Sequence, residues 1–486
     1  MNLNKDTICA IATGTGGAGI GIVRISGPEA IDIADRLFRG KRKLSELRTY
    51  TAAYGQLIRS VSDQGEEEYL DEVIALVMRG PRTYTTEDVV EFSCHGGHLV
   101  LRRVLELLIR EGARLAEPGE FTRRAYLGGR IDLSEAEAVM DLIAAENDRA
   151  LEASLHQLKG SLRTAVTELR EKLLYETAFI ESALDDPENY SLDGYTDRIR
   201  QVLAESQKKL QELTDGAEEG RLLRRGIRTA IIGRPNAGKS SILNLLLGED
   251  RAIVTEIAGT TRDTLEEKAV LGGIPLVLID TAGIRDTEDV VERIGVERAK
   301  KELEEADLIL FILDASHPLT DEDTFIAKEL PEGVPVVVLL NKQDMDVEVS
   351  PEDVMRLPGL SRAAAADGSP ASGQSASDGQ GPRVIEISAV TGEGKEQLRD
   401  ALQQQFFSGG ISENGERYLL NTRHLEAIHE AGEALNRVMD SVDAGVGEDF
   451  YTIDLLAAYE ALGHITGETL EDDLADKIFS DFCMGK

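Results

Sequence analysis

Residues 233–240 read Gly-Arg-Pro-Asn-Ala-Gly-Lys-Ser, which is the G-x-x-x-x-G-K-S spacing of a phosphate-binding P-loop. The loop follows the apolar run Thr229–Ile232 and precedes a helical pattern that begins at Ser240, as this motif requires. Glycines let backbone N–H groups face a β-phosphate, and the N-terminus of the following helix adds positive potential. We therefore expect Lys239 to neutralise the β- and γ-phosphate oxygens and Ser240 to bind Mg²⁺.

Three later segments occur in the order that a guanine-nucleotide switch requires. Asp280–Gly283 ends an apolar run, where a carboxylate holds Mg²⁺ through water and a backbone N–H senses the γ-phosphate. Asn341–Asp344 ends another run, and the Asp344 carboxylate accepts from guanine N1–H and N2–H, a donor pair that adenine lacks. Ser388 and Ala389 are expected to complete the base pocket with backbone donors. In this order after a P-loop, the motifs predict a GTPase.

Hydrolysis of the nucleotide needs a group that orients the attacking water. Residues 257–263, Ile-Ala-Gly-Thr-Thr-Arg-Asp, occupy the switch I position, and Thr261 is the expected second hydroxyl ligand of Mg²⁺. The glutamine that orients water in Ras is missing, because Ile284 stands near that position and no glutamine follows it closely. The candidates are Glu292, which would orient the water, and a monovalent cation that Asn236 would help to bind.

Two sets of residues are therefore expected at the nucleotide. The catalytic candidates are Lys239, Asp280 and Glu292. The residues expected to contact GTP are Asn236, Ala237, Gly238, Lys239, Ser240, Ser241, Thr255, Glu256, Ile257, Ala258, Gly259, Thr260, Thr261, Asp280, Thr281, Ala282, Gly283, Asn341, Lys342, Asp344, Ser388 and Ala389.

Apolar runs and helical patterns must position these loops. Strands are predicted at residues 229–233, 276–280, 308–314, 334–340 and 384–388, with helical patterns between most of them. That order predicts a doubly wound parallel sheet. Nearer the N-terminus, strands predicted at 6–13, 21–26, 72–78 and 88–94 and a helix at 99–112 indicate a mixed α/β domain.

A helical pattern separates and follows these two α/β regions. An apolar stripe with a period of 3.6 residues begins at Ile131, with Ser134 and Glu137 at capping-box spacing, and is broken at 185–187. Further helices are predicted at residues 197–213, 424–439, 453–462 and 470–482. We expect the late helices to pack on the early ones, which would make the second α/β region an insertion in a helical domain.

The length of 486 residues predicts about three domains. The expected fold is multidomain α/β plus all-α, with an N-terminal α+β domain at 1–130, a helical domain in two parts at 131–220 and 409–486, and an inserted Ras-like P-loop G domain with a doubly wound sheet at 221–408. Residues 362–382 are low-complexity Ala, Gly and Ser and are expected to form a flexible insertion.

The charge is strongly acidic and unevenly distributed. The net charge is -36, yet residues 1–130 carry 18 acidic and 18 basic residues. A negative field repels phosphate backbones, which argues against a general nucleic-acid coat protein but leaves room for a local site.

The sequence has no apolar run of 18 residues and no secretory pattern, so a cytoplasmic location is expected. Cys9, Cys94 and Cys483 are too few and scattered for a disulfide framework or a zinc site.

Segments throughout the chain resemble one family, the tRNA modification GTPases MnmE (TrmE). They are GRPNAGKSS, IAGTTRD, DTAGIR, VERIG and NKQD around the nucleotide, YTTEDVVEFSCHGGH and EPGEFTRRAYLGGRIDLSEAEAV in the first 150 residues, and the terminal FCMGK. The resemblance implies an N-terminal folate-binding and dimerisation domain, a helical domain, and a G domain inserted into it.

The resemblance also implies a reaction that the nucleotide motifs cannot show. With a flavin-dependent partner, MnmG (GidA), which carries FAD, such proteins build a carboxymethylaminomethyl or aminomethyl group on C5 of the wobble uridine (position 34) of certain tRNAs. The one-carbon unit comes from 5,10-methylenetetrahydrofolate. Potassium-dependent dimerisation of the G domains activates GTP hydrolysis. The implied assembly is a homodimer that MnmG joins into a heterotetramer.

Site residues follow from the resemblance position by position. Asn236, Thr255, Ile257 and Thr260 match the potassium-binding positions, Ser240 and Thr261 match the magnesium ligands, and Glu292 matches the glutamate that acts on the hydrolytic water. The folate contacts fall on Arg24, Glu91, Arg130 and Lys486. Cations suit the glutamate tail of folate, and a carboxylate suits the N–H donors of the pterin ring.

Other sequence signals leave alternatives open. Gly14–Gly19 is formally a G-x-G-x-x-G, but a strand pattern follows it, so a turn is predicted. His95 and His98 lack a third metal ligand, and a turn before the following helix is predicted there too.

Cys483, included among the catalytic candidates, is either a structural thiol or a reactive thiol near the folate site. Four basic clusters are either solvated faces or tRNA contacts: Lys41–Lys43, Arg102-Arg103, Arg123-Arg124 and Arg221–Arg228.

Two rival functions use the same motifs. In the first, the GTPase acts only as a switch in ribosome or complex assembly, and its N-terminal domain binds a partner. In the second, the chain is a folate-dependent methyltransferase with a vestigial G domain. The matching N-terminal and C-terminal folate motifs disfavour the first rival, and the intact nucleotide motifs disfavour the second.

Overall fold

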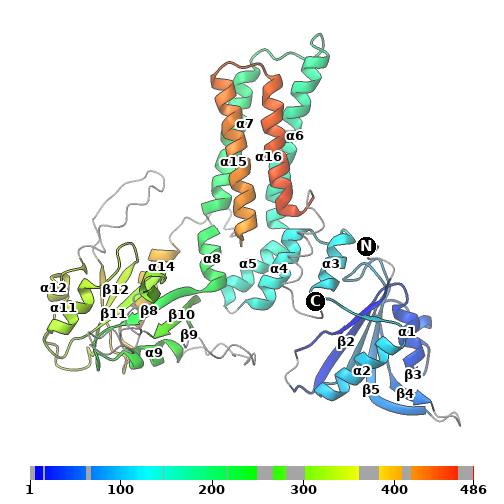
Figure 1. Cartoon of the computed structure of the whole chain (residues 1–486), viewed down its shortest axis with the longest axis horizontal. Helices are drawn as coiled ribbons and strands as arrows, with labels where there is room; N and C mark the ends of the chain where they lie inside the picture. The colour runs from blue at the N-terminus through cyan, green and yellow to red at the C-terminus, as the bar shows by residue number, and fades with distance from the viewer. Residues whose placement is uncertain are drawn as a thin grey trace. The chain divides into compact units, whose positions relative to one another are not determined.

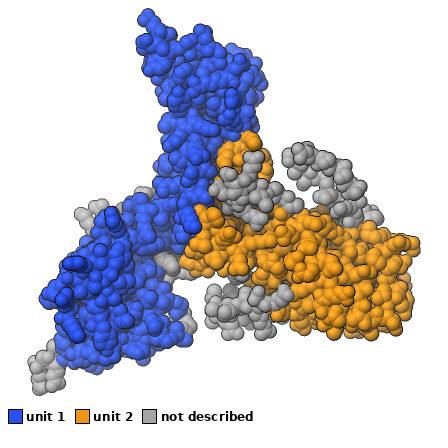
Figure 2. Space-filling model, turned by 180° about the vertical axis from the view of Figure 1, so that it is seen from behind, with its two compact units in different colours: residues 1–140, 157–207, 426–486 blue, residues 141–156, 208–425 orange. Residues whose placement is uncertain are grey.

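The computed structural model describes residues 6–14, 17–61, 67–145, 147–215, 217–248, 266–280, 301–360, 382–407, 418–468 and 485. The chain divides into two compact units (Figure 2). The first comprises Met1–Met140, Gln157–Gln207 and Glu426–Lys486, and the second comprises Asp141–His156 and Lys208–Leu425. Within the described residues, every helix is too short or too polar to cross a bilayer.

A seven-stranded sheet forms the N-terminal part of the first unit, in the order β3-β4-β5-β6-β2-β1-β7. Its strands are β1 (Ile8–Ile11), β2 (Ile20–Ser26), β3 (Phe38–Gly40), β4 (Thr51–Val61), β5 (Glu67–Met78), β6 (Val89–His95) and β7 (Arg114–Leu115). Neighbouring strands are antiparallel except β1 and β7, which are parallel. The mixed α/β character predicted for this region is confirmed.

Helices α1 (Ala30–Leu37) and α2 (His98–Arg110) cover one face of this sheet (Figure 1). Alternate residues of the strands, such as Val73, Ala75 and Val77 of β5, join the apolar side chains of these helices in one core. The short helices η1 (Leu44–Glu46) and α3 (Glu120–Leu127) complete the domain. The predicted turn at Gly14–Gly19 lies between β1 and β2, which pair antiparallel and have no intervening helix, so a dinucleotide fingerprint is excluded.

Four long helices form a bundle in the first unit: α6 (Ser161–Asp185), α7 (Tyr195–Asp215), α15 (Thr422–Asp443) and α16 (Asp449–Thr466) (Figure 1). The Arg170 guanidinium of α6 lies 4.1 Å from the ring centroid of Tyr459 on α16. The Gln207 amide of α7 donates to Asn436 on α15 at 2.6 Å. Packing of the late helices on the early ones is thus confirmed for α15 and α16, whereas residues 470–482 lie outside the described residues.

The periodic stretch that starts at Ile131 forms three helices, α4 (Leu133–Ala144), α5 (Asp148–Leu158) and α6, and Gly160 precedes α6 with a φ of 84°. The predicted capping box of Ser134 and Glu137 is wrong. The reciprocal bonds join Asp132 and Glu135 instead, because α4 begins at Leu133: the Glu135 N–H donates to Asp132 Oδ1 at 2.8 Å, and the Asp132 N–H donates to Glu135 Oε2 at 2.8 Å.

A six-stranded sheet forms the second unit, in the order β13-β12-β11-β8-β10-β9. Its strands are β8 (Ile227–Ile232), β9 (Glu266–Leu271), β10 (Ile274–Asp280), β11 (Leu308–Asp314), β12 (Val336–Asn341) and β13 (Arg383–Glu386). Its helices include α8 (Ala217–Arg225), α9 (Lys239–Leu247), α11 (Asp321–Lys328), α12 (Pro351–Met355) and α14 (Lys395–Phe406). The five predicted strands are present and parallel, and the unpredicted β9 adds an antiparallel edge.

Both faces of this second sheet are buried, which is what a doubly wound arrangement requires. Within β11, Leu310 and Ile312 belong to one apolar cluster, while Ile309, Phe311 and Leu313 belong to another on the opposite face. From β8 the chain runs to β9 and β10 on one side of β8 and then crosses to β11 on the other side, so the strand order reverses beside β8. Ligands of open α/β sheets bind at the carboxyl ends of the strands, next to such a reversal.

The helix cap at Asp132 provides a test of stability against pH. Burial raises the pKa of the Asp132 carboxyl more than its hydrogen bonds lower it. A carboxyl whose folded pKa lies above the unfolded value of 3.8 binds more protons in the folded state than in the unfolded state. Its contribution to the stability of the fold therefore falls as pH rises from the unfolded pKa through the folded pKa. Asp132→Asn keeps a capping oxygen and removes the buried charge. We expect the variant to melt higher than the parent at pH 7.5, and the gain to shrink at pH 5.5.

Asp353→Asn is the matched control, because Asp353 also caps a helix but hydrogen bonds from Ser350 lower its pKa. Its contribution is present at neutral pH and lost as pH falls, so this variant should lose stability at pH 7.5. Differential scanning fluorimetry of both variants measures these shifts. A melting temperature of Asp132→Asn that falls further below the parent at pH 7.5 than at pH 5.5 would contradict the assigned direction.

Candidate nucleotide-binding site

The P-loop lies between the end of β8 and the first residue of α9. Gly233 has a φ of 148°, and a Cβ there would lie 2.3 Å from the carbonyl oxygen of Ile312 in β11. Gly238 has a φ of 100°, and a Cβ there would lie 2.1 Å from the Asn341 Nδ2 atom. Both positions therefore need glycine for backbone conformation and for close packing, which explains the two glycines of the motif.

Lys239 is the first residue of α9, and its side chain bends back over the loop. Its ammonium donates to the carbonyl oxygens of Gly233 at 2.7 Å and Arg234 at 3.0 Å. The positive charge is thus held at the end of the loop where the N-terminus of α9 also attracts anions. This arrangement suits the neutralisation of a polyphosphate.

The buried amide of Asn341 joins three loops. Its Nδ2 atom donates to the carbonyl of Ala237 in the P-loop at 2.9 Å, and its Oδ1 atom accepts from the Ala389 N–H at 3.1 Å. The residue is only 2% exposed, so either group would be costly to leave unpaired. Asn341 therefore fixes the distance between the phosphate-binding loop and the two predicted base-binding loops.

The predicted base-binding residues lie together beyond the ends of β12 and β13. The Ser388 hydroxyl donates to Asp344 Oδ1 at 2.6 Å and accepts from the Thr391 N–H at 3.2 Å. Ser388 was expected to act through its backbone, but in the structure its side chain also orients the Asp344 carboxylate. The carboxylate is exposed and is aligned before any base is present.

One residue of this site, Asp314, was missed by sequence reasoning. Asp314, the last residue of β11, accepts from the Lys342 ammonium at 2.7 Å and lies 3.5 Å from the Arg234 guanidinium of the P-loop. Burial raises the pKa of Asp314, but hydrogen bonds from Lys342 and Ser316 lower it by more, so the net pKa is below 3.8. The sequence did carry one signal for Asp314, since it is a carboxylate at the end of an otherwise apolar run.

The donor set near the P-loop fits Mg²⁺. Ser240 is exposed at the second position of α9, and Asp280 is the last residue of β10, which pairs in parallel with β8. Mg²⁺ usually binds through one or two protein oxygens together with phosphate and water, and the exposed Ser240 hydroxyl can supply one of them. The roles of the Asp280 carboxylate and of Thr261 stay predictions. Groups of three or more His, Cys, Asp or Glu side chains placed to share a metal are absent from the described residues.

Several predicted site residues lie outside the described residues, so their predicted roles stay predictions. These are Thr255, Glu256, Ile257, Ala258, Gly259, Thr260, Thr261, Thr281, Ala282, Gly283, Ile284, Glu292, Cys483 and Lys486, together with residues 362–381 of the expected insertion.

A second cluster of predicted residues lies on the N-terminal sheet. Arg24 of β2 and Glu91 of β6 are register partners, and their side chains form an ion pair at 2.7 Å. The Arg24 and Arg130 guanidiniums lie 5.8 and 5.0 Å from the ring centroid of Tyr84. The structure thus brings together three of the four residues expected to bind folate, and adds Tyr84 between the two cations.

Gly485 lies beside the same cluster. The carbonyl of Gly485 accepts from Arg24 at 3.4 Å, and a Cβ on Gly485 would lie 2.3 Å from the carbonyl oxygen of Ile11 in β1. Only glycine allows so close an approach at a φ of 92°. The position next to the predicted Lys486 is therefore anchored beside Arg24.

The remaining candidates form no site in the described part of the chain. His95 pairs with Asp71 at 2.6 Å, which raises the pKa of His95. Burial raises the pKa of Cys9 and of Cys94 to about 12, so both thiols are inert.

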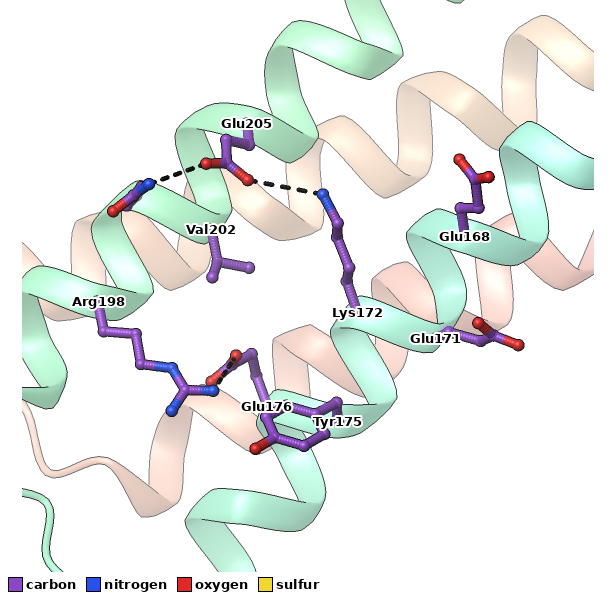
Figure 3. A pocket seen from close by; sticks show the side chains of 9 residues that line it. Glu168, Glu171, Lys172, Tyr175, Glu176, Arg198, Val202 and Glu205 are labelled. Carbon is purple, nitrogen blue, oxygen red and sulfur yellow. Dashed lines mark hydrogen bonds and ion pairs between the residues drawn. The ribbon is translucent and has the colours of Figure 1, made fainter.

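A hollow of about 630 Å³ lies between α6 and α7 (Figure 3). Four glutamates line it, but Lys172 pairs with Glu205 at 3.5 Å and Arg198 pairs with Glu176 at 2.7 Å. Its cations are thus already paired, and the hollow lacks the backbone donors that a polyphosphate needs.

Comparisons with known proteins cover the whole chain. The family model "GTP-binding protein TrmE N-terminus" matches residues 7–130, and "MnmE helical domain" matches residues 133–483. The "tRNA modification GTPase MnmE" of Lachnoclostridium phytofermentans is 47% identical, with 100% of both chains covered. The protein of the same name from Bacillus subtilis is 44% identical over 99% of this chain and 100% of its own. A solved structure of an Aquifex aeolicus Era variant bound to GDP and AlF4⁻ is 28% identical over 44% of this chain and 67% of its own, with a TM-score of 0.27.

Base recognition can be tested at Asp344. An asparagine there loses the acceptor for one of the two guanine donors and offers an N–H that matches the extra oxygen of xanthine. We expect Asp344→Asn to lower kcat/KM for GTP by roughly 100-fold or more and to favour xanthosine triphosphate. Asp346→Asn is the control, since Asp346 is exposed and two residues away. Steady-state hydrolysis of both nucleotides is the measurement, and an unchanged preference for GTP would refute the assignment.

Proposed function

We propose, for a chain that belongs to the MnmE family of tRNA modification GTPases, that GTP hydrolysis drives modification of the wobble uridine of tRNA at position 34. The protein is a GTP-hydrolysing enzyme that uses Mg²⁺. The observation that carries the proposal is that Asn341 joins the P-loop to the base-binding loops by hydrogen bonds. In the same chain, the N-terminal sheet holds a separate cluster of cations and a carboxylate. The first site supplies energy, and the second would hold the one-carbon donor.

The second site is proposed to bind 5,10-methylenetetrahydrofolate through Arg24, Glu91, Arg130 and Lys486. Two guanidiniums held by Tyr84 offer charge-assisted hydrogen bonds to the anionic glutamate tail. Glu91, which is 18% exposed at its side chain, keeps acceptor capacity for the N–H donors of the pterin ring. The one-carbon unit would become the methylene group attached to C5 of uridine, a free amine or amino acid would supply the remainder of the aminomethyl or carboxymethylaminomethyl group, and FAD on the partner MnmG would supply the redox chemistry.

A homodimer is proposed because large apolar side chains are exposed on one face of the N-terminal sheet. Ile20 and Tyr54 are each 66% exposed, and Ile74 is 50% exposed. Tyr54 and Ile74 are register partners on β4 and β5, on the face opposite α1 and α2. Exposed apolar patches of this kind mark interaction surfaces in soluble proteins, and a second copy of this sheet is the occupant that we propose. MnmG would then join the dimer to form the heterotetramer.

K⁺ is proposed to supply the charge stabilisation that a catalytic arginine gives in other GTPases. Asn236, Thr255, Ile257 and Thr260 would hold it with oxygen atoms. Asn236 fits this role, since it is exposed in the P-loop with a φ of 65°, a strained conformation for a residue other than glycine. Glu292 would orient the attacking water in place of the missing glutamine.

Cation selectivity tests the K⁺ proposal. Hydrolysis in K⁺ should be at least tenfold faster than in Na⁺, which is too small for the same set of oxygens, and Asn236→Ala should remove the difference. Light scattering should give a dimer mass for the full chain in both salts, because the sheet face holds the copies together without K⁺. Equal rates in the two salts would rule out the cation role, and a monomer mass would rule out the sheet contact.

Nucleoside mass spectrometry tests the function as a whole. In a strain lacking the gene, tRNA should lose its C5-modified wobble uridines, and the wild-type chain should restore them. Gly238→Ala should not restore them, because its Cβ overlaps the Asn341 amide and closes the P-loop. Unchanged wobble uridines in the deletion strain would instead favour a GTPase switch in ribosome or complex assembly.

A further inference from the structure

Five exposed cations gather at one end of the N-terminal sheet. Residues 41–50 lead into β4 and residues 79–82 follow β5, and β4 and β5 are antiparallel neighbours, so the two segments lie side by side. We call the five side chains that they expose the basic rim: Lys41, Arg42, Lys43, Arg48 and Arg82. The rim is a local positive surface on a chain of net charge -36.

Hydrogen bonds hold the two segments together. The Arg79 guanidinium donates to the carbonyls of Ser45 at 2.7 Å and Leu47 at 3.3 Å, and the Arg79 N–H donates to the Thr49 hydroxyl at 2.9 Å. The Tyr50 hydroxyl donates to the carbonyl of Arg82. The backbone beneath the rim is therefore ordered before a ligand arrives, which reduces the entropy cost of binding.

The rim side chains have no acidic partner among the described residues. Several other exposed cations have acidic partners: Arg103 pairs with Glu106 at 2.8 Å, and Arg225 pairs with Asp307 at 2.6 Å. Within residues 41–50, the only carboxylate is Glu46, beside four cations. The rim thus keeps its charge for an external anion.

We propose that the basic rim binds the phosphate backbone of the tRNA anticodon arm. Unpaired cations around a fixed backbone match closely spaced phosphates, and Tyr50, which is 60% exposed beside them, is placed to stack on an unpaired base. Arg82 is two residues from Tyr84, which contacts both cations of the proposed folate site, so the rim borders that site within about 7 Å of chain. The inference rests on the proposed function in one respect, that tRNA is the substrate.

The test compares two variants of equal charge change. Arg42→Gln/Arg82→Gln removes two rim cations, and Arg102→Gln/Arg103→Gln removes two exposed cations of α2 that are paired with Glu106. Fluorescence anisotropy with an unmodified tRNA transcript measures the affinity of each full-length chain from 50 to 200 mM KCl. We expect the rim variant to bind roughly tenfold more weakly or worse at 100 mM, with a salt slope lower by about 1.5, and the α2 variant to bind nearly as well as the parent.

Several results would overturn the rim assignment. The first is an equal loss of tRNA affinity in the two variants, and the second is no binding of tRNA by the parent chain at 50 mM KCl. The third is that the rim substitutions weaken binding to vesicles of phosphatidylglycerol and phosphatidylcholine at 1:3 but leave the affinity for tRNA unchanged. GTP hydrolysis by both variants should match the parent, which shows that they are folded.

Complementation of the deletion strain separates this inference from the proposed function. If the wild-type chain restores wobble modification and the rim variant restores less than the α2 variant, both stand. If the wild-type and both variants restore it equally, the rim assignment fails alone. If the deletion leaves the wobble uridines unchanged, the proposed function fails.

Discussion

The amide of Asn341 is the constraint on which the nucleotide site depends. A buried primary amide must satisfy both its donor and its acceptor, and here the two bonds reach different loops, to Ala237 and to Ala389. The phosphate-binding and base-binding loops therefore keep a fixed separation, set by one side chain at the end of β12. Asp314 adds a second link, since it contacts Lys342 of one loop and Arg234 of the other.

Charge pairing elsewhere in the chain explains how a strongly acidic protein handles anionic ligands. In the N-terminal domain the buried Arg124 forms ion pairs with Asp6, Glu87 and Glu120, and Arg114 forms ion pairs with Asp6 and Glu120. Burial disfavours these charges, but the pKa of Glu120 is nevertheless lowered because Arg114 and Arg124 donate to it. In the part of the N-terminal domain that the structure describes, this cluster offers no free cation, whereas the basic rim does.

The apolar periodicity predicted the parallel strands and the bundle helices, because burial on both faces, or on one stripe, leaves a pattern in the residues themselves. It did not predict β9, whose sequence Glu-Glu-Lys-Ala-Val-Leu is half charged because it lies at a sheet edge. The P-loop and the guanine-binding motifs were found because their chemistry is local. Arg24, Glu91 and Arg130 were identified only by resemblance. Sheet register pairs Arg24 with Glu91, and tertiary packing brings Arg130, which lies outside the strands, close to them, and sequence spacing encodes neither. Tyr84 was missed because it joins this cluster through tertiary packing, and Asp314 was missed because its partners, Lys342 and Arg234, are distant in sequence.

The contact between Arg24 and Gly485 joins residues 461 positions apart, whereas Asn341 and Ala237 are 104 apart. During synthesis the chain emerges from the N-terminus at a finite rate, so the nucleotide loops can close long before residue 485 reaches the first sheet. The newly made protein is thus able to hold a nucleotide before its other pocket is finished. Completion of that pocket therefore requires that residue 485 has been translated.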